Sequence, residues 1–392
     1  MRDNLFHVLW LCGPAGVGKS TVSWQLFSEL GDAGVPVAFA DTDQLGMCHP
    51  AADEEPGRQR VKVQNVGAMI PNYRAAGAQY AIINGVIDPV SGLPAEWPPQ
   101  SEVTICRLRA SHDEVERRFL ARDGESEDLA ELLSEVRDEI TGFDQGSFAD
   151  ACVDTTGVTQ GDVAALVRDV CKAWPGFSAD HAAPRVQGNE LARTGVDGAG
   201  VDGEVMLIAG PTGVGKSTVG FRVYVNCMNG RLGAGYVDLE QIGFIRPAPC
   251  DAMQRHRLRA RNVAAIWRNY RAAGATHLVA TGPIEDRAAF QVYAEELPAA
   301  SVKLCRLRAG YDQLSQRIMS RGAGGSWPQP GDPLRGQPEE MLRAVAARAA
   351  EEAAALDRSG PGGVAIDTDG LTVDEAADLI AQAAGWASER HS

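Results

Sequence analysis

Short apolar runs alternate with longer mixed segments along the whole chain. Runs of four to eight residues bounded by glycine or polar residues are typical of buried strands, and the segments between them are long enough for helices. Strands that alternate with helices pair in parallel, so the pattern predicts α/β domains, each with a parallel sheet covered on both faces. The expected strands lie at 5–12, 35–40, 80–83, 103–108 and 152–154, and again at 204–209, 234–237, 277–280, 302–307 and 364–367.

The two halves of the chain repeat one another. G-P-A-G-V-G-K-S at 13–20 returns as G-P-T-G-V-G-K-S at 210–217, which is 197 positions later (210 minus 13). N-Y-R-A-A-G-A at 72–78 returns at 269–275 with the same offset. A period of this size is that of a domain and not of a solenoid repeat. We therefore interpret the chain as a tandem duplication.

A glycine-rich stretch without hydrophobic periodicity lies between the repeats, at 177–203. Such composition is typical of a linker. The expected organisation is a first domain at 1–176, a linker at 177–203 and a second domain at 204–392.

Both repeated octapeptides match G-x-x-x-x-G-K-[ST]. In this motif backbone N–H groups surround phosphate oxygens at the start of a helix, the lysine reaches the β- and γ-phosphates, and the hydroxyl holds Mg²⁺. A glycine turn that binds nothing is the alternative, and it is disfavoured because both copies follow a predicted strand and open a predicted helix. The residues expected to bind ATP are Gly13, Ala15, Gly16, Val17, Gly18, Lys19, Ser20 and Thr21, and Gly210, Thr212, Gly213, Val214, Gly215, Lys216, Ser217 and Thr218, with Ser20 and Ser217 on Mg²⁺.

Two acidic residues follow the second predicted strand of each half. They are Asp41 and Asp43 in D-T-D-Q, and Asp238 and Glu240 in D-L-E-Q. Alternate residues at a strand end can present two carboxylates near a γ-phosphate, one toward Mg²⁺ and one to accept a proton from a substrate hydroxyl. Solvated turn acids are the alternative, and the recurrence favours a catalytic role.

With these motifs the chain resembles the small P-loop kinases of metabolism, the group that contains shikimate, gluconate and adenylylsulfate kinases. The repeated C-R-L-R-A at 106–110 and 305–309 adds to the likeness. The resemblance implies two P-loop NTPase domains of the nucleoside-monophosphate-kinase type, with Asp43 and Glu240 on the acceptor side or acting as the base. It also implies that Arg74 and Arg271 clamp the acceptor, and that Arg118, Arg122, Arg317 and Arg321 belong to a lid or to the nucleotide side.

The chain also departs from that group. After the third strand it reads N-G-V-I-D at 84–88 and T-G-P-I-E at 281–285, where shikimate kinase has a glycine triplet, and the shikimate kinase lid signature is missing. The resemblance therefore implies no particular acceptor for this chain. Asp88 and Glu285 occupy equivalent positions, as Walker-B-like acids or as loop acids.

The segments expected to form the lids differ between the halves. The segment after Arg122 is acidic, and the one after Arg321 is rich in glycine and proline. Each is interpreted as a mobile lid or as a variable surface loop.

Composition narrows the partners. Lys and Arg total 37 against 52 for Asp and Glu, a formal net charge of −15, which disfavours nucleic acid and anionic membranes. No apolar stretch approaches the ~20 residues of a membrane span. The eight cysteines form no C-x-x-C pair, which is typical of a reducing compartment. We expect a cytoplasmic monomer or homodimer whose partner is a small-molecule phosphate acceptor.

The expected function is an ATP- and Mg²⁺-dependent phosphotransferase that acts through one or both domains. The alternative is a nucleotide-binding ATPase or regulator that transfers no phosphate to a metabolite. A kinase acting on nucleic-acid ends is a third class, which the net charge disfavours.

Overall fold

The computed structural model of the chain is organised as two compact units, each built around a six-stranded sheet. Unit 1 comprises Met1–Gly46, Glu55–Thr194 and Phe244–Cys250, and unit 2 comprises Met47–Glu54, Gly195–Gly243 and Asp251–Ser392. The residues that the structure describes are 5–50, 58–87, 93, 97–123, 129–146, 148–178, 201–325, 332–359 and 362–386.

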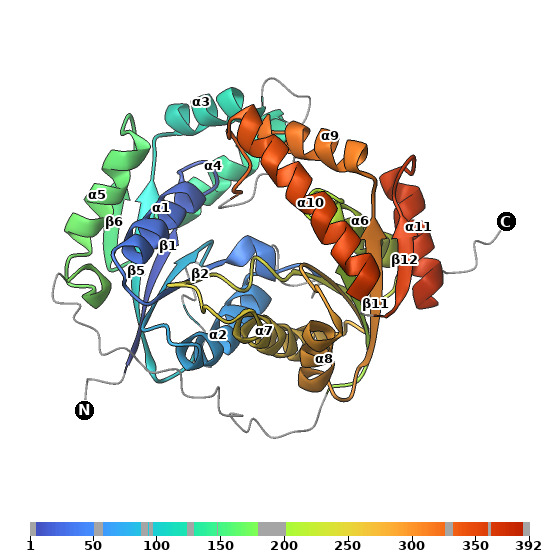
Figure 1. Cartoon of the computed structure of the whole chain (residues 1–392). Helices are drawn as coiled ribbons and strands as arrows, with labels where there is room; N and C mark the ends of the chain where they lie inside the picture. The colour runs from blue at the N-terminus through green and yellow to red at the C-terminus, as the bar shows by residue number, and fades with distance from the viewer. Residues whose placement is uncertain are drawn as a thin grey trace. The chain divides into compact units, whose positions relative to one another are not determined.

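Unit 1 follows the expected alternation of strands and helices (Figure 1). Its elements from the first half of the chain are β1 (Phe6–Cys12), α1 (Lys19–Asp32), β2 (Val37–Asp41), η1 (Thr42–Leu45), α2 (Gln59–Ala75), β4 (Tyr80–Asn84), β5 (Ser101–Arg109), α3 (His112–Asp123), α4 (Leu129–Gln145), β6 (Ala151–Asp154), α5 (Gln160–Val170) and η3 (Pro175–Phe177).

Among the described residues, unit 2 has the same order of strands and α-helices, with one further helix after its third strand. Its elements from the second half are β7 (Glu204–Ala209), α6 (Lys216–Asn229), β8 (Ala234–Asp238), α7 (Ala252–Ala272), β10 (His277–Thr281), α8 (Arg287–Glu296), β11 (Ser301–Arg308), α9 (Tyr311–Gly322), α10 (Glu339–Ser359), β12 (Val364–Asp367) and α11 (Val373–Ala384).

The two sheets have the same strand order. It is β6-β5-β1-β4-β2-β9 in unit 1 and β12-β11-β7-β10-β8-β3 in unit 2. The first five strands of each list are parallel, as the hydrophobic pattern predicts, so their carboxyl ends meet at one edge of the sheet. The strand that carries the P-loop is central in each sheet. The motifs that follow β2 and β8 therefore end up near it.

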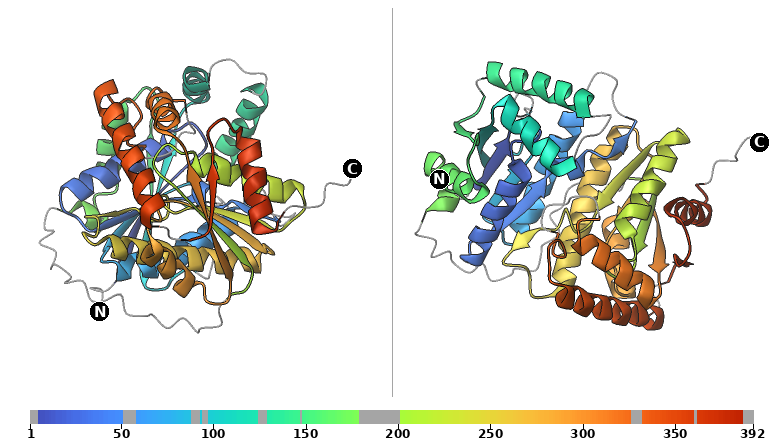
Figure 2. Two further views of the ribbon diagram at one scale, coloured as in Figure 1. Left: turned by 45° about the vertical axis from the view of Figure 1, so that its right-hand side comes forward. Right: turned by 90° about the horizontal axis from the view of Figure 1, so that it is seen from above.

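Both faces of each sheet are covered by helices (Figure 2). In unit 1, Leu9 and Leu11 of β1 belong to the core under α1 and α5, whereas Trp10, between them, points to the other face and packs on Trp97 at 5.7 Å. This alternation follows from the two-residue period of a strand. It explains why the strands read as continuous apolar runs rather than as alternating ones.

The sixth strand of each sheet was not predicted. β9 (Ile245–Arg246) pairs antiparallel with β2 in unit 1, and β3 (Cys48–His49) pairs antiparallel with β8 in unit 2. Each unit thus includes a short segment whose chain neighbours belong to the other unit. Phe244 shows how such a segment is held, since its ring packs on Trp24 of unit 1 at 4.9 Å.

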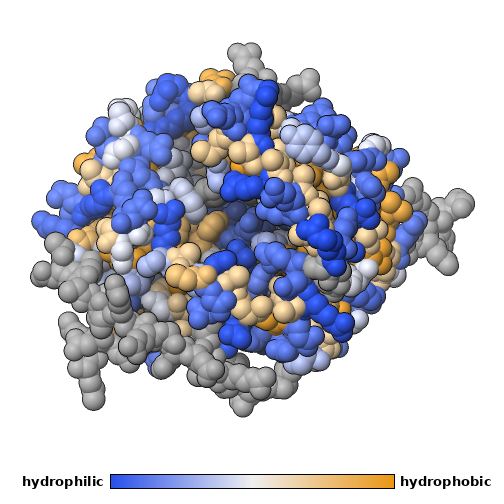
Figure 3. Space-filling model, in the orientation of Figure 1, coloured by the Kyte–Doolittle hydropathy of each residue, from blue (hydrophilic) through white to orange (hydrophobic). Residues whose placement is uncertain are grey.

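The surface seen in Figure 3 is mostly hydrophilic, and its hydrophobic side chains form small separate patches. The large apolar side chains that are exposed are scattered in the sequence. Among the described residues, no helix is both long enough and apolar enough to cross a membrane. The exposed large apolar side chains are Leu120, Leu166, Val170, Phe221, Tyr311, Met341, Val364, Val373 and Leu379.

Candidate nucleotide and acceptor site

The P-loop of each unit joins the central strand to the following helix. α1 begins at Lys19 and α6 begins at Lys216. The residue before each lysine is the helix N-cap and has left-handed backbone, with φ 96° at Gly18 and 99° at Gly215. Glycine adopts this conformation without the steric cost that other residues have. The first amide groups of each helix therefore face the loop and are available to an anion.

A second glycine lets the loop pass close to a helix. A Cβ added at Gly213 would lie 2.7 Å from Ile318 of α9, and one added at Gly16 would lie 2.8 Å from Phe119 of α3. Both glycines have positive φ, 81° and 80°. The loops are thus packed tightly on the helix that carries the predicted lid arginines.

The P-loop lysines are half-buried under their loops. Lys216 donates to the carbonyls of Gly210 at 2.9 Å and Pro211 at 3.1 Å, and Lys19 donates to Pro14 at 2.9 Å. Burial lowers the pKa of both lysines. The largest opposing effects come from the carboxylates of Asp43 and Glu240 respectively, which favour the charged form.

A serine hydroxyl and a carboxylate meet beside the P-loop of unit 2. Ser217 Oγ donates to Asp238 Oδ2 at 2.8 Å, and Asp238 is only 4% exposed. Burial, and after it the charge of Glu240, raise the pKa of Asp238. A buried carboxylate kept next to a hydroxyl oxygen is the kind of ligand pair that Mg²⁺ prefers.

In unit 1 an amide stands between the corresponding groups. Asn84 Nδ2 donates to Ser20 Oγ at 2.9 Å and to Asp41 Oδ2 at 2.7 Å. Burial, and after it the charge of Asp43, raise the pKa of Asp41 to about 6. Asn84 is fully buried, and its Oδ1 atom has no hydrogen-bond partner among the described residues. A buried oxygen without a partner is costly, but the atom of Asn84 that faces Ser20 and Asp41 is Nδ2 and not Oδ1. The oxygen donors that fit Mg²⁺ are therefore Ser20 with Asp41 in unit 1 and Ser217 with Asp238 in unit 2.

The second acid of each pair is joined to the first through its backbone. The N–H groups of Asp43 and Glu240 donate to Asp41 and Asp238 at 3.0 and 2.9 Å. These backbone bonds fix the turn that carries both acids. In unit 1, Lys62 binds Asp43 at 3.0 Å, a pairing that the sequence did not predict.

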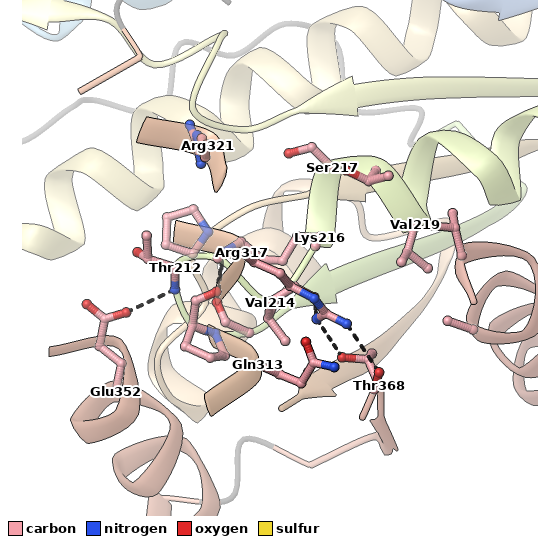
Figure 4. A pocket seen from close by; sticks show the side chains of 18 of the residues that line it. Thr212, Val214, Lys216, Ser217, Val219, Gln313, Arg317, Arg321, Glu352 and Thr368 are labelled. Carbon is pink, nitrogen blue, oxygen red and sulfur yellow. Dashed lines mark hydrogen bonds between the residues drawn. The ribbon is translucent and has the colours of Figure 1, made fainter. Parts of the chain in front are cut away.

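Arg317 and Arg118 connect the P-loop to the loop after the last strand. Arg317 Nη1 donates to the Val214 carbonyl at 2.8 Å and to Thr368 Oγ1 at 2.9 Å, as Figure 4 shows. Arg118 forms the corresponding bridge to Thr155, at 3.1 Å to Oγ1 and 2.7 Å to the carbonyl. Both arginines therefore lie on the loop side of the site.

The two candidate lid arginines can be compared only in part. Arg321 donates from Nε to Asp332 at 2.8 Å, and the side chain of Asp332 is 6% exposed. The positive charge of Arg321 also lowers the pKa of Lys216, so the two side chains are close enough to interact electrostatically. Arg122 lies in α3, but its side chain is outside the described part of the chain, as is Asp88.

Arg74 and Arg271 do not lie where the resemblance implies, and we correct this expectation. Arg271 binds Asp202, just before β7, at 2.6 Å, and the Ala275 carbonyl, just before β10, at 2.6 Å. Arg74 binds Gln100, just before β5, at 3.3 Å. These partners precede parallel strands, so both arginines lie at the edge of the sheet opposite the P-loop. Each sits in the last turn of its helix, and the helix runs away from the site.

A carboxylate from the lid region reaches the P-loop in both units. Glu352 of α10 accepts a hydrogen bond from the Thr212 N–H at 3.2 Å (Figure 4). In unit 1, Glu139 of α4 accepts one from the Ala15 N–H at 3.0 Å. Thr212 and Ala15 hold the same place in the two loops. Both contacts span more than 120 positions of the chain, and no local motif in the sequence marks the two glutamates.

In unit 2 these groups surround one cavity of about 880 Å³. This volume is within the range of small-ligand sites. Glu240 and the segment after β10, up to Glu285, line it as well. The predicted nucleotide residues that line it are Gly210, Thr212, Gly213, Val214, Gly215, Lys216, Ser217, Thr218, Arg317 and Arg321.

The strand order and the strand–loop–helix motif place both units in the P-loop class of α/β folds.

No family model and no curated protein sequence matches the chain. Among solved structures, the tunicamycin resistance protein of Deinococcus radiodurans is similar at 22% identity over 47% of this chain and 97% of its own, with a TM-score of 0.32. A gluconokinase from Sinorhizobium meliloti is similar at 19% identity over 47% and 94%, with a TM-score of 0.30. The APS kinase of Mycobacterium tuberculosis is similar at 16% identity over 46% and 96%, with a TM-score of 0.29.

Proposed function

We propose that the protein is an ATP- and Mg²⁺-dependent phosphotransferase that acts on a small-molecule acceptor through one or both of its units. The observation that carries this proposal is the cavity of unit 2. A P-loop with its half-buried Lys216 lines one part of it, and the acidic Glu240 lines another. A donor phosphate and an acceptor hydroxyl can therefore occupy the same cavity.

The nucleotide would lie along the P-loop. The loop amides and Lys216 would bind the β- and γ-phosphates, and Arg317 and Arg321 would contribute positive charge from α9. Ser217 and Asp238 would hold Mg²⁺, which when bound neutralises charge on the phosphates. The equivalent residues of unit 1 are Lys19, Ser20 and Asp41, and the Asn84 amide donates to both Ser20 and Asp41.

In the transfer step the acceptor oxygen forms a bond to the γ-phosphorus. The bond between this phosphorus and the bridging oxygen breaks, and ADP leaves. The proton of the acceptor hydroxyl passes to Glu240 in unit 2, or to Asp43 in unit 1. Most of the rate enhancement would come from positioning and from neutralising charge.

A second candidate is a nucleotide-dependent switch that hydrolyses ATP and transfers no phosphate to a metabolite. The contacts of Glu352 and Glu139 with the P-loops favour this switch. An incoming phosphate would compete with these glutamates for the loop amides, and their release would free α10 and α4 from the P-loops. The acidic residues on the acceptor side of the cavity favour transfer instead.

The two candidates differ in what receives the phosphate. The full-length protein is incubated with Mg²⁺ and ATP labelled in the γ-phosphate, together with panels of small hydroxyl- and amine-bearing metabolites. A phosphotransferase yields a labelled acceptor in at least one panel. Release of labelled inorganic phosphate alone, at a rate that no acceptor changes, would favour the switch.

A further inference from the structure

Unit 2 contains a histidine that is buried beside the acceptor part of its cavity. His256, in the first turns of α7, has a side chain that is 4% exposed. Its Nε2 atom lies 2.8 Å from Glu285 Oε2, and its Nδ1 atom lies 3.2 Å from the hydroxyl of Tyr293 in α8. The ring of Tyr293 packs edge-on against it at 5.9 Å. Both ring nitrogens of the histidine are therefore engaged.

These contacts determine the direction of the hydrogen bonds. A carboxylate can only accept, so Nε2 of His256 carries a proton and donates it to Glu285. In the neutral ring Nδ1 then accepts from the Tyr293 hydroxyl. The result is a chain from Tyr293 through His256 to Glu285, and two of its three members are buried. Such a chain restricts the orientation of the carboxylate at its end.

Glu285 is the exposed end of this chain. Its side chain is 63% exposed, and the residue lines the same cavity as the P-loop and Glu240. The hydrogen bond from His256 is the largest influence that lowers the pKa of Glu285, and the positive charge of Arg259 on α7 acts in the same direction. Glu285 therefore presents a negative charge to the cavity at neutral pH.

The charges around the cavity are unevenly divided. Within the described part of the chain, the basic residues that line it are Lys216, Arg317 and Arg321, which belong to the P-loop or to α9 and are used by the nucleotide in the proposed function. Three acids among the described residues also line the cavity: Glu352 of α10, which contacts the P-loop, and Glu240 and Glu285, which follow β8 and β10. An acceptor between Glu240 and Glu285 would meet two carboxylates, which favour hydrogen-bond donors and cations and repel anions.

We propose that Glu285, oriented by His256 and Tyr293, binds the acceptor of unit 2, and that this acceptor presents hydroxyl or ammonium groups rather than a carboxylate or phosphate. This inference rests on the proposed function in taking the cavity as the acceptor site. Glu285 binds the acceptor directly, whereas His256 and Tyr293 act as positioning residues.

The same arrangement is not available to unit 1. The residue that corresponds to His256 at the repeat offset of 197 is Gln59. The counterpart of β10 in unit 1 is β4, and no helix equivalent to α8 occurs after it among the described residues. Among the described residues, the histidine of this chain therefore has no counterpart in unit 1.

The test is equilibrium binding to the full-length protein in the presence of Mg²⁺ and a non-hydrolysable ATP analogue. The probes are polyols, amino sugars, nucleosides and the aldonic acids with the same carbon skeletons, measured by calorimetry. The variants are Glu285→Gln, His256→Gln and the control Glu295→Gln, which alters an exposed glutamate of α8 outside the cavity lining.

We expect a neutral or cationic class to bind and the matched acids to bind at least tenfold more weakly. Glu285→Gln should weaken binding of the preferred class about tenfold, while Glu295→Gln should leave it unchanged. His256→Gln should weaken it less and leave binding of the ATP analogue unchanged, which a general loss of structure would not do.

The inference is overturned if the acids bind as well as the other classes, if Glu285→Gln has no effect, or if no class binds. Its failure can be told apart from failure of the proposed function. Selective binding without transfer of label from ATP would contradict the phosphotransferase and leave the role of Glu285 intact. Transfer of label to an acid would support the phosphotransferase and contradict the role of Glu285.

Discussion

The Glu352 carboxylate accepts a hydrogen bond from the backbone N–H of Thr212 at 3.2 Å, so an acid of α10 binds a group that the P-loop uses for phosphate. The same relationship joins Glu139 to Ala15 in unit 1 at 3.0 Å. The negative charge of each glutamate also raises the pKa of the P-loop lysine in its unit, which favours the charged form of the lysine. A bound triphosphate would compete with these carboxylates for both partners.

We expect Glu352→Gln to bind ATP more tightly, by about three- to tenfold, which corresponds to about 0.7–1.4 kcal/mol. The neutral amide no longer repels the phosphates and competes less well for the Thr212 N–H. Calorimetric titration of the full-length protein with ATP measures the change. Glu351→Gln, an exposed neighbour on the same helix, serves as the control. Weaker binding by the Glu352 variant would mean that this contact orders the loop rather than blocking it.

We expect the guanidinium group of Arg317 to be needed both for the stability of unit 2 and for ATP binding. Its Nη1 atom binds Val214 and Thr368, and its Nη2 atom binds the Thr368 carbonyl at 3.2 Å. The single ammonium group of lysine cannot reproduce this geometry. We expect Arg317→Lys to lower the free energy of unfolding by about 1–2 kcal/mol and to weaken ATP binding. Urea denaturation with and without ATP measures both, and a variant that is as stable as the wild type would contradict the role of the bridge.

Arg271 is expected to matter for stability and not for transfer. Its partners Asp202 and Ala275 lie at the edge of the sheet away from the P-loop. Arg271→Lys should therefore leave kcat/KM for the acceptor within about twofold of the wild type, and the melting temperature should fall. A rise in acceptor KM of tenfold or more, at unchanged stability, would restore the acceptor clamp that the resemblance implies.

The contact between Glu285 and His256 predicts a pH dependence of stability. Arg259 and Tyr293 also face this carboxylate, and the net effect is that its pKa in the folded state lies below the ordinary value of 4.5. An acid with a depressed pKa stabilises the fold above its unfolded pKa, and this contribution is lost as the pH falls through the folded pKa. The difference in stability between wild type and Glu285→Gln should therefore be present near neutral pH and shrink below pH 4.5. Thermal unfolding of both proteins over this range measures it, and a difference that grows on acidification would contradict the pairing.

The fold could be predicted where the signal in the sequence is local. The five parallel strands of each unit appear as apolar runs, and the expected 204–209 and 364–367 coincide with β7 and β12. The P-loops are read from their glycines because the required backbone geometry excludes other residues. Strands β3 and β9 have two residues each and carry no periodic signal, so they were not predicted.

The parts of the site that the sequence did not reveal depend on long-range geometry. Glu139 and Glu352 reach their P-loops from helices that the chain enters more than a hundred residues later. Arg74 and Arg271 were placed by resemblance at the acceptor, but they lie in the last helical turn, which ends at the opposite edge of the sheet. One signal for His256 was present in the sequence. It is a place where the two repeats differ, with glutamine at 59 and histidine at 256.

We propose that the P-loops hold ATP for transfer to a small acceptor. The most direct test is the rate of labelled phosphate transfer from ATP to the best acceptor, compared among the full-length wild type, Lys19→Ala, Lys216→Ala and the double variant. We expect at least one single change to reduce transfer by about a hundredfold or more and the double variant to be inactive. Transfer that survives in the double variant, or a folded wild type that binds ATP and labels no acceptor, would contradict it.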